Sequence, residues 1–141
     1  MRSLAALKHG STQTIPSNNN MILSIDHIQI AMPAGQEEKA RAFYVNLLGF
    51  TEISKPPELA IRGGAWFESG ITQLHLGVEP DFRPARKAHP AFVVDNLHAL
   101  LEKIQTAGCE VDSSQPPLDG YKRAHVFDPF GNRIELMEKL A

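Results

Sequence analysis

Residues 125–138, His-Val-Phe-Asp-Pro-Phe-Gly-Asn-Arg-Ile-Glu-Leu-Met-Glu, are the stretch that decides the fold. Residues 128–132 have the residue types of a tight turn, because Pro fixes φ while Gly and Asn tolerate positive φ. The residues after the turn alternate as in a β-strand, so Ile134 and Leu136 share one face and Glu135 lies on the other. A charge in the middle of a strand is usually exposed or paired. The rest of the chain indicates what pairs with Glu135.

The composition bounds the class of protein. A chain of 141 residues with 43% apolar and 21% charged residues is typical of a soluble globular domain. The net charge of −2 argues against a nucleic-acid partner, which would require clustered Lys and Arg. No apolar run approaches the roughly 20 residues of a membrane span. The single cysteine, Cys109, favours a reducing compartment, so we expect a cytoplasmic protein.

The pattern divides the chain into an extension and one domain. Residues 1–20 are rich in Ser, Thr, Asn and Gln and have no acidic residue, and we expect them to be a disordered N-terminal extension. Residues 21–141 are expected to form a single domain. A first part, about 22–80, predicts the order strand, helix, strand, strand, strand, with the first strand beginning at Ile22. A second part, about 87–138, repeats this order.

The register of the repeat aligns four side chains that can bind metal. Phe67 stands 8 residues before His75, and Phe127 stands 8 residues before Glu135, so His75 and Glu135 occupy equivalent positions. His27 and His89 likewise occupy equivalent positions in the first strand of each part. The alternation along each strand turns all four side chains away from the apolar layer that the helices would cover. Two sheets related by a pseudo-twofold axis could therefore bring His27, His75, His89 and Glu135 into one concave site.

These motifs resemble the vicinal oxygen chelate superfamily, which includes glyoxalase I, bleomycin-resistance proteins and extradiol dioxygenases. The resemblance covers about residues 22–138 and is carried by motifs in both parts of the chain. They are Asp26-His27-Ile28, Ala42-Phe43-Tyr44 with Leu47-Leu48-Gly49-Phe50, His89, Asp128-Pro129-Phe130-Gly131-Asn132 and Ile134-Glu135-Leu136. The resemblance implies an α+β fold of tandem βαβββ modules, with a concave mixed sheet and helices on its outer face.

The resemblance also implies a metal site. In metal-dependent members the ligand positions fall on His27, His89 and Glu135, and the fourth position, Glu or Gln in relatives, falls on His75. Imidazoles with a carboxylate suit a divalent metal such as Zn, Ni, Co, Mn or Fe(II). Glu135 is the candidate catalytic base. Taken singly, each of these residues would more often be a structural strand residue or a solvent-facing one.

Other polar and aromatic side chains receive no ligand role from the sequence. His125 is a candidate for lining the cavity but fits no ligand position in the repeat. The candidates for a substrate pocket, with core or surface roles as the alternative, are Trp66, Phe67, Tyr121 and Arg123.

Several functions remain open at this point. The first is a metal-dependent lyase, isomerase, transferase or dioxygenase that acts on a small molecule with neighbouring oxygens. The second is a metal-free drug- or metabolite-binding protein of the bleomycin-resistance type, and the third is a sensor or inactive relative. Small relatives are commonly homodimers in which His27 and His75 of one chain meet His89 and Glu135 of the other, although pairing within one chain is the alternative. We expect the homodimer.

Overall fold

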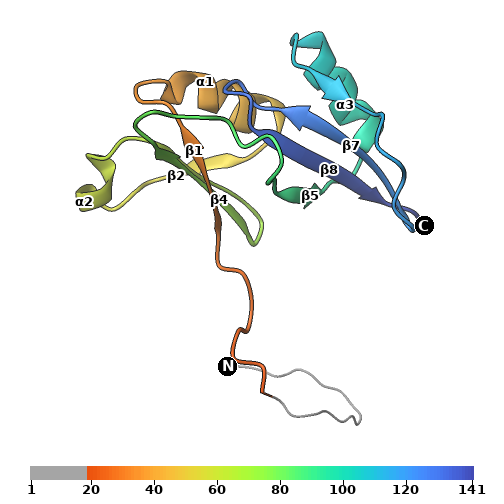
Figure 1. Cartoon of the computed structure of the whole chain (residues 1–141), viewed down its shortest axis with the longest axis horizontal. Coiled ribbons are helices and arrows are strands. Elements are labelled where there is room, and N and C mark those ends of the chain that lie inside the picture. Colours follow the sequence, from red (N-terminus) through yellow and green to blue (C-terminus); the bar gives the residue numbers. More distant parts are fainter. Residues whose placement is uncertain (1–18) are drawn as a thin grey trace.

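The computed structural model describes residues 19–141 (Figure 1). The predicted N-terminal extension, residues 1–20, therefore lies outside the described residues except for Asn19 and Asn20, which are exposed. Within residues 19–141, no helix is both long enough and apolar enough to cross a membrane.

The first module contains one four-stranded mixed sheet in the order β1-β4-β3-β2. β1 runs parallel to β4, and the other two pairs are antiparallel. Its elements are β1 (Ile28–Met32), α1 (Glu37–Arg41), the π-helical segment η1 (Ala42–Leu47), β2 (Thr51–Ile53), α2 (Pro57–Ala60), β3 (Ala65–Ser69) and β4 (Thr72–Val78).

The second module repeats this topology in the order β5-β8-β7-β6. β5 runs parallel to β8, and β7 is antiparallel to both β6 and β8. Its elements are β5 (Ala91–Val93), α3 (Leu97–Thr106), β6 (Val111–Asp112), β7 (Tyr121–Phe127) and β8 (Arg133–Lys139). The predicted tandem βαβββ architecture is confirmed.

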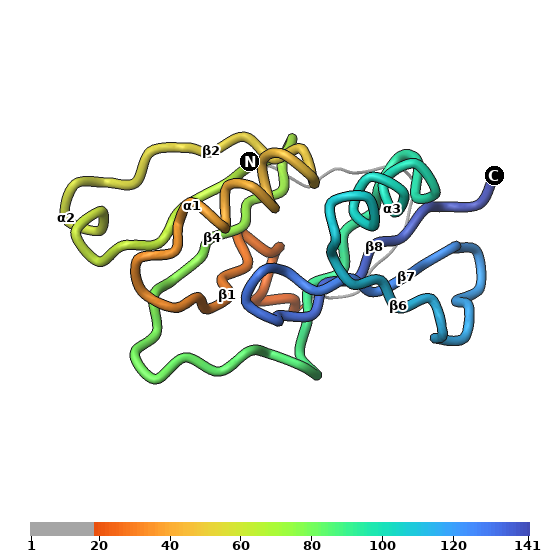
Figure 2. Tube along the Cα trace, turned by 90° about the horizontal axis from the view of Figure 1, so that it is seen from above, coloured from red at the N-terminus to blue at the C-terminus, as the bar shows by residue number. Residues whose placement is uncertain are grey.

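The long helices cover one face of the two sheets. In Figure 1, α1 and α3 lie on the same side of the strands, and Figure 2 shows the two modules next to each other. The apolar faces beneath the helices join into one buried cluster, in which Phe50 of the first module contacts Phe92 of the second at 5.6 Å between ring centroids. This shared core leaves the opposite faces of the sheets free for polar side chains.

The turn motif of residues 128–132 ties the two modules together. Asp128 Oδ1 accepts hydrogen bonds from the backbone N–H groups of Phe130 and Asn132, which closes the turn. Its Oδ2 accepts a 2.7 Å hydrogen bond from the buried Tyr44 hydroxyl of η1, and Asn132 Nδ2 donates to Ala31 O of β1 at 2.9 Å. The motif is thus a structural clamp between modules as well as a turn.

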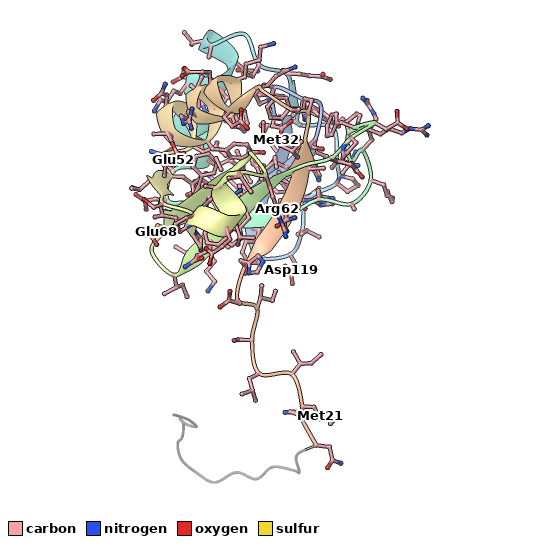
Figure 3. The ribbon with its side chains drawn as sticks, turned by 90° about the vertical axis from the view of Figure 1, so that its left-hand side faces the viewer. Met21, Met32, Glu52, Arg62, Glu68 and Asp119 are labelled. Atoms are coloured by element: carbon pink, nitrogen blue, oxygen red, sulfur yellow. The ribbon has the colours of Figure 1, made fainter. Side chains whose placement is uncertain are left out.

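The first strand is shorter than predicted. β1 begins at Ile28, opposite Leu74, whereas the sequence predicted a strand from Ile22. One reason is that β4 starts at Thr72, so among residues 19–141 no strand lies beside residues 22–25 in the register of β1 and β4. In Figure 3 this segment extends away from the body of the molecule, and Met21 is 92% exposed.

Candidate metal centre

Glu135 is the centre of a polar cluster on the second sheet. It lies on β8 between Ile134 and Leu136, which are buried beneath the helices, so its side chain points to the opposite face. It is directly opposite His125 of β7 in the antiparallel register, and side chains of such pairs lie on the same face. Only 5% of Glu135 is exposed, so its carboxylate needs partners.

His89 reaches Glu135 from the segment just before β5. The Glu135 N–H donates to Pro90 O at 3.0 Å, which fixes this segment beside β8. His89 Nδ1 lies 2.9 Å from Lys87 O, and because a carbonyl only accepts, Nδ1 carries the proton. Nε2 is thereby turned toward Glu135 Oε1 at 3.0 Å. Two electron-rich atoms this close require a proton or a metal ion between them.

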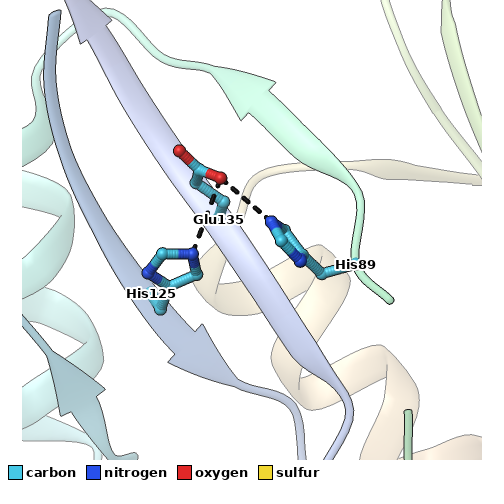
Figure 4. Close-up of side chains that lie close together, drawn as sticks. All are labelled: His89, His125 and Glu135. Carbon is cyan, nitrogen blue, oxygen red and sulfur yellow. Dashed lines mark hydrogen bonds and ion pairs between the residues drawn. The ribbon is translucent and has the colours of Figure 1, made fainter. Parts of the chain in front are cut away.

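His125 completes the cluster in Figure 4. Its Nε2 lies 3.5 Å from Glu135 Oε1, and its ring meets the His89 ring edge to face at 5.2 Å. Burial, with the nearby positive charge of Arg133, lowers the pKa of His125, so its ring is neutral near pH 7. One donor atom each from His89, His125 and Glu135 lie within 4.8 Å of one another.

Arg123 holds the second oxygen of the carboxylate. Its guanidinium lies 3.2 Å from Glu135 Oε2, while its Nε and second terminal nitrogen donate to Pro116 O. Burial acts to raise the pKa of Glu135, but the hydrogen bonds with His89 and Arg123 outweigh it and hold the pKa below its ordinary value. The carboxylate is therefore ionised, with Oε1 directed at the two imidazoles.

The other two predicted ligands lie together on the first sheet. His75 is sandwiched between His27 and Trp66, with ring centroids 4.1 and 4.0 Å away and nearly parallel planes. Burial, His27 and Lys55 lower the pKa of His75, which keeps its ring neutral. The predicted set of four is thus present as two pairs, one on each sheet.

Sequence reasoning assigned no ligand role to His125 because the two hairpins differ in length. The β3–β4 hairpin closes with the pair Ser69–Thr72, whereas the β7–β8 hairpin closes with Phe127–Arg133 around the turn of residues 128–132. The residue opposite His75 is therefore Trp66, and the residue opposite Glu135 is His125. Constant spacing along the sequence instead aligns Trp66 with Val126. The longer turn was the signal that could have corrected the register.

Two hollows border these residues. One of about 410 Å³ lies between the modules, and its lining includes His27, Phe50, Ile71 and Phe92. Another of about 530 Å³ lies on the first module, and its lining includes His27, His75, Trp66, Lys55 and Arg62. Their size suits a small molecule.

The donor set of the second module fits a divalent transition metal. Two imidazole nitrogens and one carboxylate oxygen, converging from three neighbouring strands or their ends, match the ligand preference of such ions and leave coordination positions open. The Nδ1 contact of His89 with a carbonyl is the supporting hydrogen bond that metal-binding histidines usually make.

The family model of the Glyoxalase/Bleomycin resistance protein/Dioxygenase superfamily matches residues 24–136, and this chain belongs to that family. A glyoxalase family protein from Bacillus anthracis is similar over 86% of this chain and 98% of its own, with 48% identity and a TM-score of 0.78.

Two further solved structures are similar. The fosfomycin resistance protein FosX from Listeria monocytogenes, complexed with Mn(II) and sulfate, shares 19% identity over 85% of this chain and 93% of its own, with a TM-score of 0.70. The antibiotic-binding protein TnmS3 from Streptomyces sp. CB03234 shares 25% identity over 84% of this chain and all of its own (100%), with a TM-score of 0.64. Proteins with a similar fold thus include one crystallised with Mn(II) and one that binds an antibiotic.

Proposed function

We propose that this protein is a metal-dependent enzyme that binds a small substrate through two neighbouring oxygens. The observation that carries the proposal is the orientation of His89, whose Nδ1–H is held by Lys87 O so that Nε2 faces Glu135 Oε1 at 3.0 Å. His89 and Glu135 form the centre of the metal site, and the ion is Zn, Ni, Co, Mn or Fe(II).

Glu135 is the catalytic base in this proposal. A bound divalent ion would supply Lewis acidity toward the substrate oxygens. Arg123 holds Oε2, so Oε1, the oxygen that would bind the ion, would accept a substrate proton after it loosens from the metal. The low pKa of Glu135 keeps Oε1 unprotonated before substrate arrives. Proton abstraction of this kind is common to lyase and isomerase chemistry, whereas transferase and dioxygenase chemistry would use the same site without it.

The active form in this proposal is a homodimer. The segment before β1 is apolar and exposed, with Leu23 and Ile25 at 90% and 78% exposure, and Ile71 and Val93 near the modules' junction are also exposed. Apolar surface of this kind is typical of an interface. A second copy would place its own His27 and His75 opposite His89 and Glu135. Light scattering after size-exclusion chromatography should give twice the 15.6 kDa chain mass, and a monomer would reject this part.

A metal-free binding protein is the second candidate. It is favoured by the stack of His27, His75 and Trp66, because stacked rings form an aromatic wall rather than a set of converging ligands. The similarity to the antibiotic-binding TnmS3 supports the same candidate. A cytoplasmic location is proposed for either function, since the single cysteine suits a reducing compartment.

Metal analysis distinguishes the two functions. Protein purified without a chelating resin should contain close to one divalent metal per chain, and Glu135→Ala should lose it. Oxygen uptake that depends on anaerobically loaded Fe(II) would identify a dioxygenase, whereas activity with Ni, Co, Zn or Mn without oxygen uptake would identify the other chemistries. Absence of bound metal in the wild type, also after incubation with each of these ions, would reject the enzyme and favour the binding protein.

A further inference from the structure

We propose that the hollow on the first module binds an anionic end of the substrate, a carboxylate or a phosphate group, through Lys55 and Arg62. This inference rests on the proposed function, in which the substrate reaches the metal through two neighbouring oxygens. It specifies that the substrate is a small acid.

The two hollows differ in charge. Among the described residues, the lining of the hollow between the modules contains Asp26 but no Lys or Arg. The hollow on the first module shares Asp26 and adds Lys55 and Arg62. The Asp26 carboxylate is 92% exposed, and its Oδ2 lies 2.9 Å from His27 Nδ1. The ammonium and the guanidinium therefore give the hollow on the first module a net positive charge, which favours an anion.

The loop that carries both cations is fixed to the sheet. Lys55 precedes α2 and Arg62 follows it (Figure 3). Lys55 Nζ donates to Gly63 O, which closes the loop and leaves two of the three ammonium donors for a ligand. The Gly64 N–H donates to Glu37 Oε2 at 2.8 Å. Gly64 has a φ of 82°, and a Cβ there would lie 2.1 Å from a backbone oxygen of β4, so a glycine lets the loop approach the sheet this closely.

The ring stack forms another wall of this hollow. His75 lies between His27 and Trp66 with nearly parallel planes, so both faces of its ring are covered and a ligand would meet its edge. Aromatic edges carry the positive end of the ring quadrupole, and imidazole and indole edges also bear N–H donors. An anion in the hollow would therefore meet positive groups on two sides.

The hollow adjoins the proposed metal centre. His27 and His75 line it, and they are the ligand positions that the resemblance implies for the first module. A substrate bound to the metal beside these histidines could extend into the hollow, whose volume of about 530 Å³ suits a small acid. An oxyanion held by Lys55 and Arg62 would then fix the orientation of the substrate.

Trp66 is the single tryptophan and lines the hollow, so its fluorescence can report binding there. Malonate and inorganic phosphate are titrated separately into the metal-stripped full-length protein at pH 7.5 and low salt, with calorimetry as a second readout. At least one of the two anions should give a saturable change, and the one that binds more tightly identifies the carboxylate or the phosphate group. Malonamide, the neutral counterpart of malonate, should give none.

Matched variants locate the bound anion. Lys55→Gln should weaken its binding by about 10-fold, and Arg62→Gln, at an exposed position, by about 3-fold. The control Lys39→Gln removes an exposed charge on α1, which covers the other face of the sheet, and should leave the affinity unchanged. Circular dichroism and thermal melting establish that each variant is folded.

A separate Mn(II) titration distinguishes this inference from the enzyme proposal. Wild-type affinity for the anion in both folded variants, equal responses to malonate and malonamide, or no response to either anion in fluorescence and calorimetry would overturn the inference. If the same protein binds Mn(II), the enzyme proposal stays intact. Anion binding that depends on Lys55 and Arg62 in a protein that takes up no divalent metal would instead reject the enzyme and support the anion site.

Discussion

The two modules have the same topology but opposite chemistry on their polar faces. In the first, Trp66, His75 and His27 form a stack of three parallel rings. In the second, the equivalent positions hold His125, Glu135 and His89, and two imidazoles face one carboxylate. Replacing one ring by an acid changes a flat wall into a cluster of ligands. The duplicated fold therefore fixes where side chains meet, and the residue types decide what they do.

The comparison requires that both modules share one core. The substitution with the largest expected effect on stability, Phe67→Ala, tests whether they do. Phe67 is fully buried and contacts Tyr44 at 5.6 Å between ring centroids. Phe67→Ala should cost about 3–5 kcal/mol of unfolding free energy through lost burial and a cavity. In urea, circular dichroism and the fluorescence of the single tryptophan, Trp66, should report the same lowered midpoint. Two separate transitions would mean that the modules are independent units.

The carboxylate of Glu135 should matter more for metal binding than an exposed carboxylate of the first module. Glu135→Gln should weaken Mn(II) binding by about 100-fold, because it removes the anionic ligand while keeping the shape. Glu58→Gln on α2 is the matched control, and its Mn(II) affinity should equal that of the wild type. Calorimetric titration measures both affinities. Equal binding by Glu135→Gln would remove the functional difference between the modules.

The clamp between the modules should have an intermediate effect. Tyr44→Phe deletes the hydroxyl that donates to Asp128 Oδ2 and should cost about 1.5–3 kcal/mol, as for hydrogen bonds to charged groups. Burial and Asp128 raise the pKa of Tyr44, so the native state retains its proton where the unfolded state would lose it. The stability that protonated Tyr44 adds to the native state is fully present below about pH 10, the pKa in the unfolded state, and is lost as the pH rises above it. Urea unfolding at pH 8 and 10.5 should therefore show a steeper alkaline loss in the wild type than in Tyr44→Phe.

The stack of the first module should be the least sensitive to substitution. His75→Phe retains a flat ring beside Trp66, so at pH 7.5 its unfolding free energy should stay within about 0.5 kcal/mol of the wild type. Because the pKa of His75 is lowered in the native state, its neutral form is favoured there. The stability that neutral His75 adds to the native state is present above about pH 6.5, the pKa of histidine in the unfolded state. It is lost as the pH falls below that value. In chelator, His75→Phe should lose less stability than the wild type between pH 7.5 and 5.5; an equal loss would contradict the burial of a neutral ring.

Local patterns in the sequence predicted much of the fold. The strand of residues 121–127 and the turn of residues 128–132 are where alternation and turn residues placed them. Gly49 and Gly108 follow the helices with positive φ, as their residue type indicates. The strand from Ile22 was predicted too early because alternation shows that a segment can be a strand but not whether a partner lies beside it.

The candidate site was predicted less completely than the fold. Glu135 and His89 meet as the repeat indicated, whereas their distance from His27 and His75 depends on how modules pair, which no spacing encodes. His125 received no ligand role from the sequence, because its position opposite Glu135 depends on the register of the hairpin. The longer second turn shifts that register by one residue. Its burial and its unpaired nitrogen are properties of the packed structure alone.

The hydrogen bond between Tyr44 and Asp128 also bears on whether the two halves could exist as separate fragments. A chain cut in the connector after Glu79 would leave the Tyr44 hydroxyl in the first half and the Asp128 carboxylate in the second half, each without its hydrogen-bond partner. Neither half-protein should be soluble when produced alone, and co-expression should rescue both. A single module of this topology would then have to associate with a second one to satisfy its buried polar groups.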